Sequence, residues 1–451
     1  MMPSGRSLDA IRPCLEGAVP AAIATCGADG TPNVTLVSQV HYVDASHVAL
    51  SFQFFNKTRE NILANPQVTV FLLHPQTSAR YRLALLYRRT ETAGPLFESM
   101  KAKLAGIASN AGMSEVFRLR GADVYQVLDV EHVPGVEVPP AQCPPCHIAR
   151  LRQLSQRLAA CSDLAGLLEQ CLEGLASQLE MPQAMVLLLD SQGQKLYTVA
   201  SHGYPLSGVG SEFPLGRGII GVAAQFRTPI RIAHMASEYA YSRAIHEHLA
   251  EAGLGNRLET EIAFPGLAEP HSQLSVPILA AGRLLGVLHV ESAEPHRFGY
   301  DEEDGLMSLA SLLGASILAL QQVADGPGEE GAALPLAAPL PGAPLTVRYY
   351  PANSSVFLGE DYLIKGVAGA IFWRLLSLHV EEQRSEFSNR ELRIDPALKL
   401  PELDDNLEAR LILLQRRLAE RSRDIVLQKC GRGRLRLLLK RPVLLQQIAA
   451  R

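Results

Sequence analysis

The stretch SQLSVPILAAGRLLGVLHVESAEPHRFGYDEEDGLMSLASLLGASI, residues 272–317, decides the fold of the central part of the chain. Gln273–Ile278 and Leu284–Ser292 are rich in aliphatic and β-branched residues and flank the turn Ala281-Gly282-Arg283. This pattern predicts a β-hairpin. The apolar run that follows predicts a helix over Asp301–Val323. Strands closed by a long helix indicate an α+β domain.

The segments upstream extend the same domain. Ile148–Leu179 predicts a long amphipathic helix with Leu151, Leu154 and Leu158 on one stripe. GRGIIGVAAQFRTPIRI, residues 216–232, follows a predicted strand and turn. Together with residues 272–317, this stretch resembles the GAF family. The resemblance implies a sensory domain over residues 148–323 that binds a small molecule, and the sequence does not identify that molecule.

Composition divides the chain into three domains. Residues 136–147 and 324–344 are rich in Pro or Gly and predict linkers, the first containing a C-x-x-C motif. Residues 1–344 carry 23 basic and 33 acidic side chains, whereas residues 345–451 carry 19 basic and 13 acidic ones. Because residues 1–344 are acidic and residues 345–451 are basic, we expect this basic tail to bind a polyanion.

The expected location is the cytoplasm. The most apolar stretch, Leu306–Leu320, is too short for a bilayer and reads as a core helix. The first residues lack a basic segment followed by an apolar run, so no signal peptide and no membrane partner are predicted. Seven cysteines in 451 residues do not form a disulfide framework and are expected to be reduced.

Strand signals dominate residues 1–135. Ala21–Thr25, Asn33–Val43, His47–Phe55 and Val68–Leu73 predict strands, and Lys57–Ala64 predicts a short helix. The run SFQFFNKTRENILANPQVTVFL, residues 51–72, preceded by GTPNVTLVSQVHYVD, residues 30–44, resembles the FMN-binding split barrels of the pyridoxamine 5′-phosphate oxidase family. The resemblance implies a β split barrel over residues 1–135.

The same resemblance implies a flavin site. Asn56, Lys57 and Thr58 would hold the FMN phosphate, because free amides at a helix start and a lysine both favour an anion. Ser51, Phe52 and, on the neighbouring strand, Gln39 would lie beside the flavin. Two alternatives stay open: another ligand such as haem, or a barrel kept without a cofactor for dimerisation and ligand sensing.

The first linker contains a pair of cysteines. Cys143-Pro-Pro-Cys146-His147 fits the pattern of covalent haem attachment, but that chemistry needs an exported protein. A zinc site would need a second pair at suitable spacing, and there is none, so no metal site is predicted. Cys143 and Cys146 remain candidates for a redox switch, or are ordinary linker cysteines.

In residues 345–451, the segments 362–379, 385–392 and 404–420 predict helices, and IVLQKCGRGRLRLLL, residues 425–439, predicts a hairpin. These segments resemble the three helices and the wing of the winged-helix DNA-binding domain of response regulators. In the third helix, Leu407, Leu411, Leu414 and Leu418 share one face and are expected to pack inward. Asp404 would cap its start.

The other face of this third helix and the wing predict a contact with double-stranded DNA. On the helix, the adjacent outward arc holds the candidate DNA-binding residues Asn406, Arg410 and Arg417 beside apolar Leu413, and Arg416, also a candidate, lies beyond it. On the wing, Arg432, Arg434 and Arg436 alternate at period two and share one face. Leu413 and Ile412 are apolar for a DNA-facing surface, and the alternatives are a solvated basic face or a winged helix used for protein contacts.

The sequence therefore predicts a multidomain regulator: a β split barrel, an α+β GAF domain and an α+β winged helix. We expect a homodimer in which a ligand or a redox change biases the pairing of long helices and the spacing of two DNA-binding heads. No catalytic residues are predicted, because no catalytic triad, carboxylate pair or phosphate loop is evident. The rival interpretation is an FMN-dependent oxidoreductase whose GAF domain regulates it and whose tail binds protein.

Overall fold

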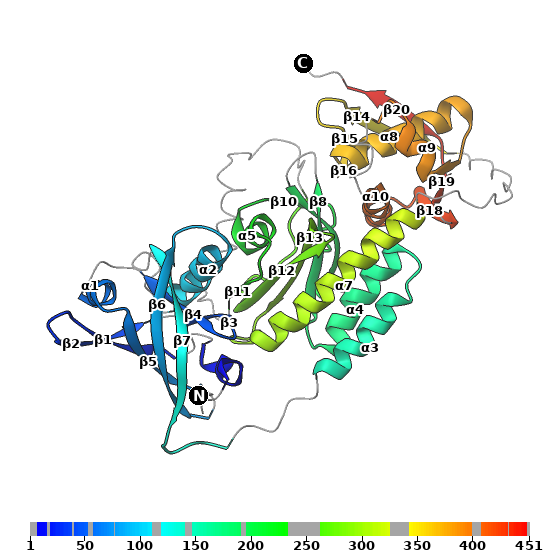
Figure 1. Ribbon diagram of the computed structural model, residues 1–451. Coiled ribbons are helices and arrows are strands. Elements are labelled where there is room, and N and C mark those ends of the chain that lie inside the picture. Colours follow the sequence, from blue (N-terminus) through cyan, green and yellow to red (C-terminus); the bar gives the residue numbers. More distant parts are fainter. Residues whose placement is uncertain are drawn as a thin grey trace.

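The computed structural model describes residues 7–15, 19–37, 40–52, 57–75, 77–110, 119–139, 147–190, 195–232, 262–324, 342–398, 407–431 and 433–448. Figure 1 shows three domains in chain order, with the central domain between the other two. The split into an N-terminal barrel-like domain and a GAF-type domain follows the sequence prediction.

The N-terminal domain is built on one strongly curved antiparallel sheet. Its strand order is β2-β1-β5-β6-β7-β4-β3. Its elements are the 3-10 helix η1 (Leu8–Leu15), β1 (Ala21–Cys26), β2 (Pro32–Val37), β3 (Val40–Asp44), β4 (His47–Phe52), α1 (Lys57–Ala64), β5 (Gln67–Leu73), β6 (Arg80–Glu91), α2 (Pro95–Asn110) and β7 (Gly121–Val133). Val68, Val70 and Leu72 alternate with outward residues along β5 and fill the barrel core, as the period of a half-buried strand requires.

The central domain is a six-stranded antiparallel sheet of order β10-β9-β8-β13-β12-β11. Its elements are α3 (His147–Ala159), α4 (Leu164–Gln178), β8 (Gln183–Asp190), β9 (Lys195–His202), β10 (Glu212–Pro214), α5 (Gly218–Phe226), β11 (Ile230–Ile232), β12 (Ser272–Ala280), β13 (Arg283–Ser292) and α7 (Tyr300–Ala324). Figure 1 places α3, α4 and α7 together on one face of the sheet and α5 on the other.

One sequence prediction about a long helix needs correction. Ile148–Leu179 forms two helices, α3 and α4, because Asp163 starts a new helix by accepting a hydrogen bond from the Gly166 amide at 2.9 Å. These helices pack with α7 inside one chain. Among the described residues, α7 is the one helix long and apolar enough to cross a membrane, and its apolar side (Leu306, Leu309, Leu313 and Ile317) lies in the central core.

The C-terminal domain combines two small sheets with three helices. Its strand orders are β16-β15-β14-β20, with β14 and β20 parallel, and β17-β19-β18. Its elements are β14 (Leu345–Tyr350), β15 (Ser355–Leu358), β16 (Asp361–Ile364), α8 (Gly366–Glu382), β17 (Glu386–Ser388), α9 (Asn389–Ile394), α10 (Leu407–Arg421), β18 (Ile425–Gly431), β19 (Arg434–Leu439) and β20 (Val443–Gln447).

Strands therefore occupy the starts of two segments predicted as helix. Residues 362–364 belong to β16, and residues 386–388 form β17, after which Ser388 caps α9 by accepting a hydrogen bond from the Glu391 amide at 3.2 Å. Asp404, predicted to cap the third helix, lies outside the described residues.

The domains share their hydrophobic cores. One cluster joins α4, β8 and β9 of the central domain to α8 and α10 of the C-terminal domain. Tyr300, at the start of α7, belongs to the core cluster of the N-terminal domain. The borders between domains are therefore packed, as interior cores are.

The first prediction concerns the cap that separates α3 from α4. Asp163→Ala should lower the free energy of unfolding of the central domain by about 1 kcal/mol, since it removes an N-cap acceptor. Urea denaturation, followed by far-UV circular dichroism, measures the change. Asp163→Asn keeps an acceptor, so its free energy of unfolding should fall much less. An equal fall in the free energy of unfolding for the two variants would contradict the capping role.

Candidate functional site

The described part of the predicted flavin site lies at the start of α1. Lys57 is exposed, and Thr58 accepts a hydrogen bond through Oγ1 from the Asn33 side chain at 2.9 Å. Ser51 is half-buried on β4. Gln39 and Asn56 lie outside the described residues, as does the side chain of Phe52. The structure thus brings Lys57 and Thr58 to one helix start, where an anion would meet a cation and backbone amides.

A buried ion pair, missed by sequence reasoning, anchors this helix start. Arg59 pairs with Asp123 of β7 and donates to Thr90 of β6 at 2.9 Å. Burial raises the pKa of Asp123, while the hydrogen bond from Thr90 and the charge of Arg59 oppose the shift. Because these partners are remote in sequence, no local motif indicates them. Among the described residues of the predicted site, Lys57 and Thr58 are therefore the two that would hold a flavin phosphate.

The N-terminal and central domains meet around one aromatic ring. The Tyr300 hydroxyl accepts a hydrogen bond from the Tyr42 amide at 3.2 Å. Cations lie 4.4 to 4.9 Å from the centre of its ring, within the range of cation–π attraction: Arg12, Lys103 and Arg231.

Acidic residues of α7 fix two of these cations. Arg12 of the N-terminal domain pairs with Asp304 at 2.6 Å, and Arg231 pairs with Glu303 at 2.7 Å. Burial, with the nearby charges of Lys103 and Arg231, holds the pKa of His41 well below its ordinary value, so its imidazole is neutral. The first turn of α7 is therefore joined to the N-terminal domain by charge as well as by packing.

A buried polar strip crosses the α5-side face of the central sheet. Gln273 and Ser275 of β12 lie opposite Glu291 and His289 of β13. Glu291 accepts hydrogen bonds from the Leu267 amide at 2.7 Å and from Gln273 at 3.1 Å. Burial alone would raise the pKa of Glu291, but the hydrogen bond and charge of His289 and the bonds from Leu267 and Gln273 hold it below its ordinary value.

This strip is the polar part of an otherwise apolar face formed by residues such as Leu187, Phe213 and Ile220. The residues of the strip are buried, and their polar groups bond to one another. Among the described residues, no group of three or more His, Cys, Asp or Glu side chains could hold a metal ion.

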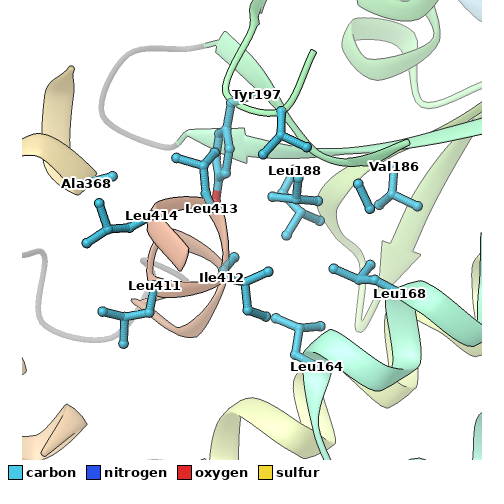
Figure 2. Close-up of a cluster of buried hydrophobic side chains, with 14 of the residues drawn as sticks. Leu164, Leu168, Val186, Leu188, Tyr197, Ala368, Leu411, Ile412, Leu413 and Leu414 are labelled. Atoms are coloured by element: carbon cyan, nitrogen blue, oxygen red, sulfur yellow. The ribbon is translucent and has the colours of Figure 1, made fainter. Parts of the chain in front are cut away.

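Helix α10 has two buried faces. Leu407, Leu411, Leu414 and Leu418 pack inward as predicted. The adjacent arc, predicted to face outward, is buried against the central domain, as is Ile412: Arg410 is 6% exposed, Leu413 3% and Ile412 4%. In Figure 2, Leu413 lies beside Tyr197 and Ile412 points toward Leu164, whereas Leu414 points toward Ala368.

Two of the predicted DNA-binding arginines contact the central domain. Arg410 pairs with Asp190 at 3.0 Å, and its guanidinium lies 3.9 Å from the centre of the Tyr197 ring. Arg416 donates to the Val199 carbonyl at 2.7 Å, and burial lowers its pKa. The apolar character of Ile412 and Leu413 was the sequence signal for this contact.

The other predicted DNA-binding residues are dispersed. Arg417 donates to the Leu363 carbonyl of its own domain at 3.1 Å and pairs with Glu420. Arg434 and Arg436 lie on β19, partly exposed, with Arg436 paired to Glu386. Asn406, Arg432, Cys143 and Cys146 lie outside the described residues.

Residues 7–128 match the family model described as pyridoxamine 5′-phosphate oxidase, and residues 161–317 match the GAF domain model. The chain joins a pyridoxamine 5′-phosphate oxidase-like domain to a GAF domain. These matches confirm the two resemblances seen in the sequence. No curated protein matches the chain.

Solved structures with similar folds cover single domains. The GAF domain of an Acinetobacter phosphoenolpyruvate-protein phosphotransferase is 21% identical, with 40% of this chain and 98% of that chain covered and a TM-score of 0.32. Free methionine-R-sulfoxide reductase from Neisseria meningitidis is 19% identical over 41% and 98% of the two chains, with a TM-score of 0.31. An FMN-binding protein from Syntrophomonas wolfei is 14% identical over 29% and 87%, with a TM-score of 0.25.

The second prediction tests the flavin site. If Lys57 holds the phosphate, Lys57→Ala should weaken FMN binding about tenfold, since a charge-assisted hydrogen bond is lost. Quenching of flavin fluorescence on titration with the protein measures the affinity. Lys101→Ala, on α2 and also exposed, is the control and should bind as the unchanged chain does. Uptake of FMN with equal affinity by both variants would remove Lys57 from the site.

Proposed function

We propose that the chain is a cytoplasmic ligand- or redox-responsive transcriptional regulator. The barrel and the GAF domain sense, and residues 345–451 act as a winged helix that binds double-stranded DNA. The observation that carries the proposal is the packing of α10 on the GAF sheet through Arg410 and Asp190. A sensor that touches its output domain directly can bias that domain without an intermediary.

Charge supports a nucleic-acid partner for the C-terminal domain. That domain has 19 basic and 13 acidic side chains, while the rest of the chain is acidic. Arg434 is partly exposed beside the turn of the β18–β19 hairpin, where a wing that contacts phosphates would carry a cation. The order of its elements, strands then three helices then a hairpin, is that of the response-regulator domain it resembles.

The GAF domain is the proposed binding site of the signal molecule. An unidentified small molecule would lie on the α5-side face, with Glu291 and Gln273 as its polar floor. FMN in the barrel, held by Lys57 and Thr58, would supply redox sensitivity, and Cys143 with Cys146 would supply it by dithiol chemistry. The oxidoreductase alternative rests on the same flavin residues, and no observation favours it over sensing.

A homodimer would present two DNA-binding heads to two half-sites. The outer face of the barrel sheet supports self-association, because the edge strand β2 exposes Val34 and Leu36 and the nearby strand β5 exposes Phe71. Exposed apolar side chains that gather on one sheet face are typical of a surface that another molecule covers. A second copy with the same face would cover it symmetrically.

The third prediction tests this assembly. Leu36→Arg should shift the chain from dimer to monomer at micromolar concentration, because two like charges would be brought into one apolar contact. Sedimentation velocity measures the shift. Val136→Arg, another exposed apolar residue away from this sheet face, is the control. A dimer unaffected by Leu36→Arg would place the interface elsewhere.

The fourth prediction tests DNA binding. Arg434→Ala should weaken the affinity of the full chain for duplex DNA of any sequence and reduce the salt slope by about one contact, since fewer counterions are released. Fluorescence anisotropy over a salt series measures both. Arg89→Ala, an exposed arginine of the barrel, is the control. No affinity for duplex DNA at low salt, with the α10 contact intact or broken, would contradict the proposed function.

A further inference from the structure

We infer that the GAF domain and duplex DNA compete for the same face of α10, so that the C-terminal domain reads DNA through this helix only after it leaves the GAF sheet. The inference rests on the proposed function and adds its regulation. In the described arrangement, the GAF domain occupies the arc of α10 on which Arg410, Leu413 and Arg416 lie.

The contact covers the middle of the helix. Ile412 and Leu413 insert between Leu164 of α4 and Tyr197 of β9, as Figure 2 shows. Gly210 approaches the same helix closely, because a Cβ atom there would lie 4.0 Å from Leu413 and 3.8 Å from Arg417. A double helix of DNA could not approach this arc while the GAF sheet is in contact with it.

The GAF domain offers α10 the same kinds of polar partner as DNA does. Asp190 gives Arg410 an anionic oxygen, and Val199 gives Arg416 a carbonyl acceptor. Phosphate oxygens and guanine acceptors are the corresponding groups on DNA. The cations of α10 can therefore exchange one set of partners for the other without being left buried and unpaired, which would be strongly unfavourable.

The rim of the contact adds one ion pair of the same charge pattern and one hydrogen bond from a neutral side chain. Glu212 of β10 pairs with Lys365, just before α8, at 3.3 Å, and Ser207 donates to Glu420 of α10. Acidic GAF residues thus face basic residues of the C-terminal domain at two places, Asp190 and Glu212. The GAF domain thus binds the basic C-terminal domain through anionic groups, as a polyanion such as DNA would.

Competition has a measurable consequence for affinity. The apparent affinity for DNA is the intrinsic affinity multiplied by the fraction of molecules in which the C-terminal domain is released. Any change that weakens the GAF side of the contact should therefore tighten DNA binding, even though the changed residues never touch DNA.

The experiment changes only GAF residues of the full chain. Asp190→Ala with Ser207→Ala removes two rim partners that are not in the hydrophobic core. We expect duplex DNA to bind about tenfold more tightly at low salt, and the amides of α10 to exchange hydrogen faster in the absence of DNA. Glu173→Ala, which removes an exposed carboxylate of α4 that pairs with Arg157, is the matched control and should change neither quantity.

The outcomes separate the inference from the proposed function. If α10 exchange accelerates but no DNA affinity is measurable in any variant, the DNA-binding function is wrong. If the unchanged chain already binds DNA as tightly as the released variant, the DNA-binding function stands and the competition is wrong.

A second variant covers the case in which Asp190→Ala with Ser207→Ala weakens the contact too little to be measured. Adding Leu164→Ala removes the apolar partner of Ile412 on the GAF side. If this triple variant stays folded, by circular dichroism, and neither α10 exchange nor DNA affinity changes, the contact is a permanent core and the inference is overturned.

Discussion

The arrangement of the molecule depends on one buried arginine. Arg410 sits between the carboxylate of Asp190 and the ring of Tyr197 and joins the helix α10 to the GAF sheet. Removing a cation from water is unfavourable unless its partners are well placed, so this contact fixes the position of α10 more narrowly than apolar packing alone would. The same contact makes α10 a component of two domains at once.

Helix α7 extends this coupling toward the barrel. It begins with Tyr300, whose ring lies in the barrel core and among the cations Arg12, Lys103 and Arg231. Its later residues share the core that contains α10. A change at the barrel junction can therefore reach the C-terminal domain through one rigid helix, provided that the two ends favour different arrangements.

Sequence patterns were sufficient where segments close together in the chain form the fold. The hairpin of residues 272–292 and the closing helix identified the GAF domain, and family models confirm it. The single helix predicted for Ile148–Leu179 was wrong because one capping residue, Asp163, outweighs continuous amphipathic periodicity. Strands β6 and β7 were not predicted, although Tyr81, Leu83 and Leu85 alternate with exposed Arg80 and Arg82 along β6 in the pattern of a half-buried strand.

The candidate sites were harder to predict because their partners come from other domains or from distant segments of the same domain. A helical wheel separates the inward leucines of α10 from the arc of Arg410, but it cannot say that a second domain covers that arc. Ile412 and Leu413 carried that information as apolar residues on a polar face. Likewise, Asp123 and Tyr300 acquire their roles only when Arg59 and Arg12 are brought to them by the fold.

Hydrogen exchange of strand β9, with and without duplex DNA, tests the central claim most directly. Lys195–His202 carries Tyr197 and Val199, which contact α10 in the absence of DNA. If DNA and the GAF sheet compete, saturating DNA should make these amides exchange faster while α10 stays protected. Unchanged or slower exchange in β9, with DNA demonstrably bound, would contradict the account.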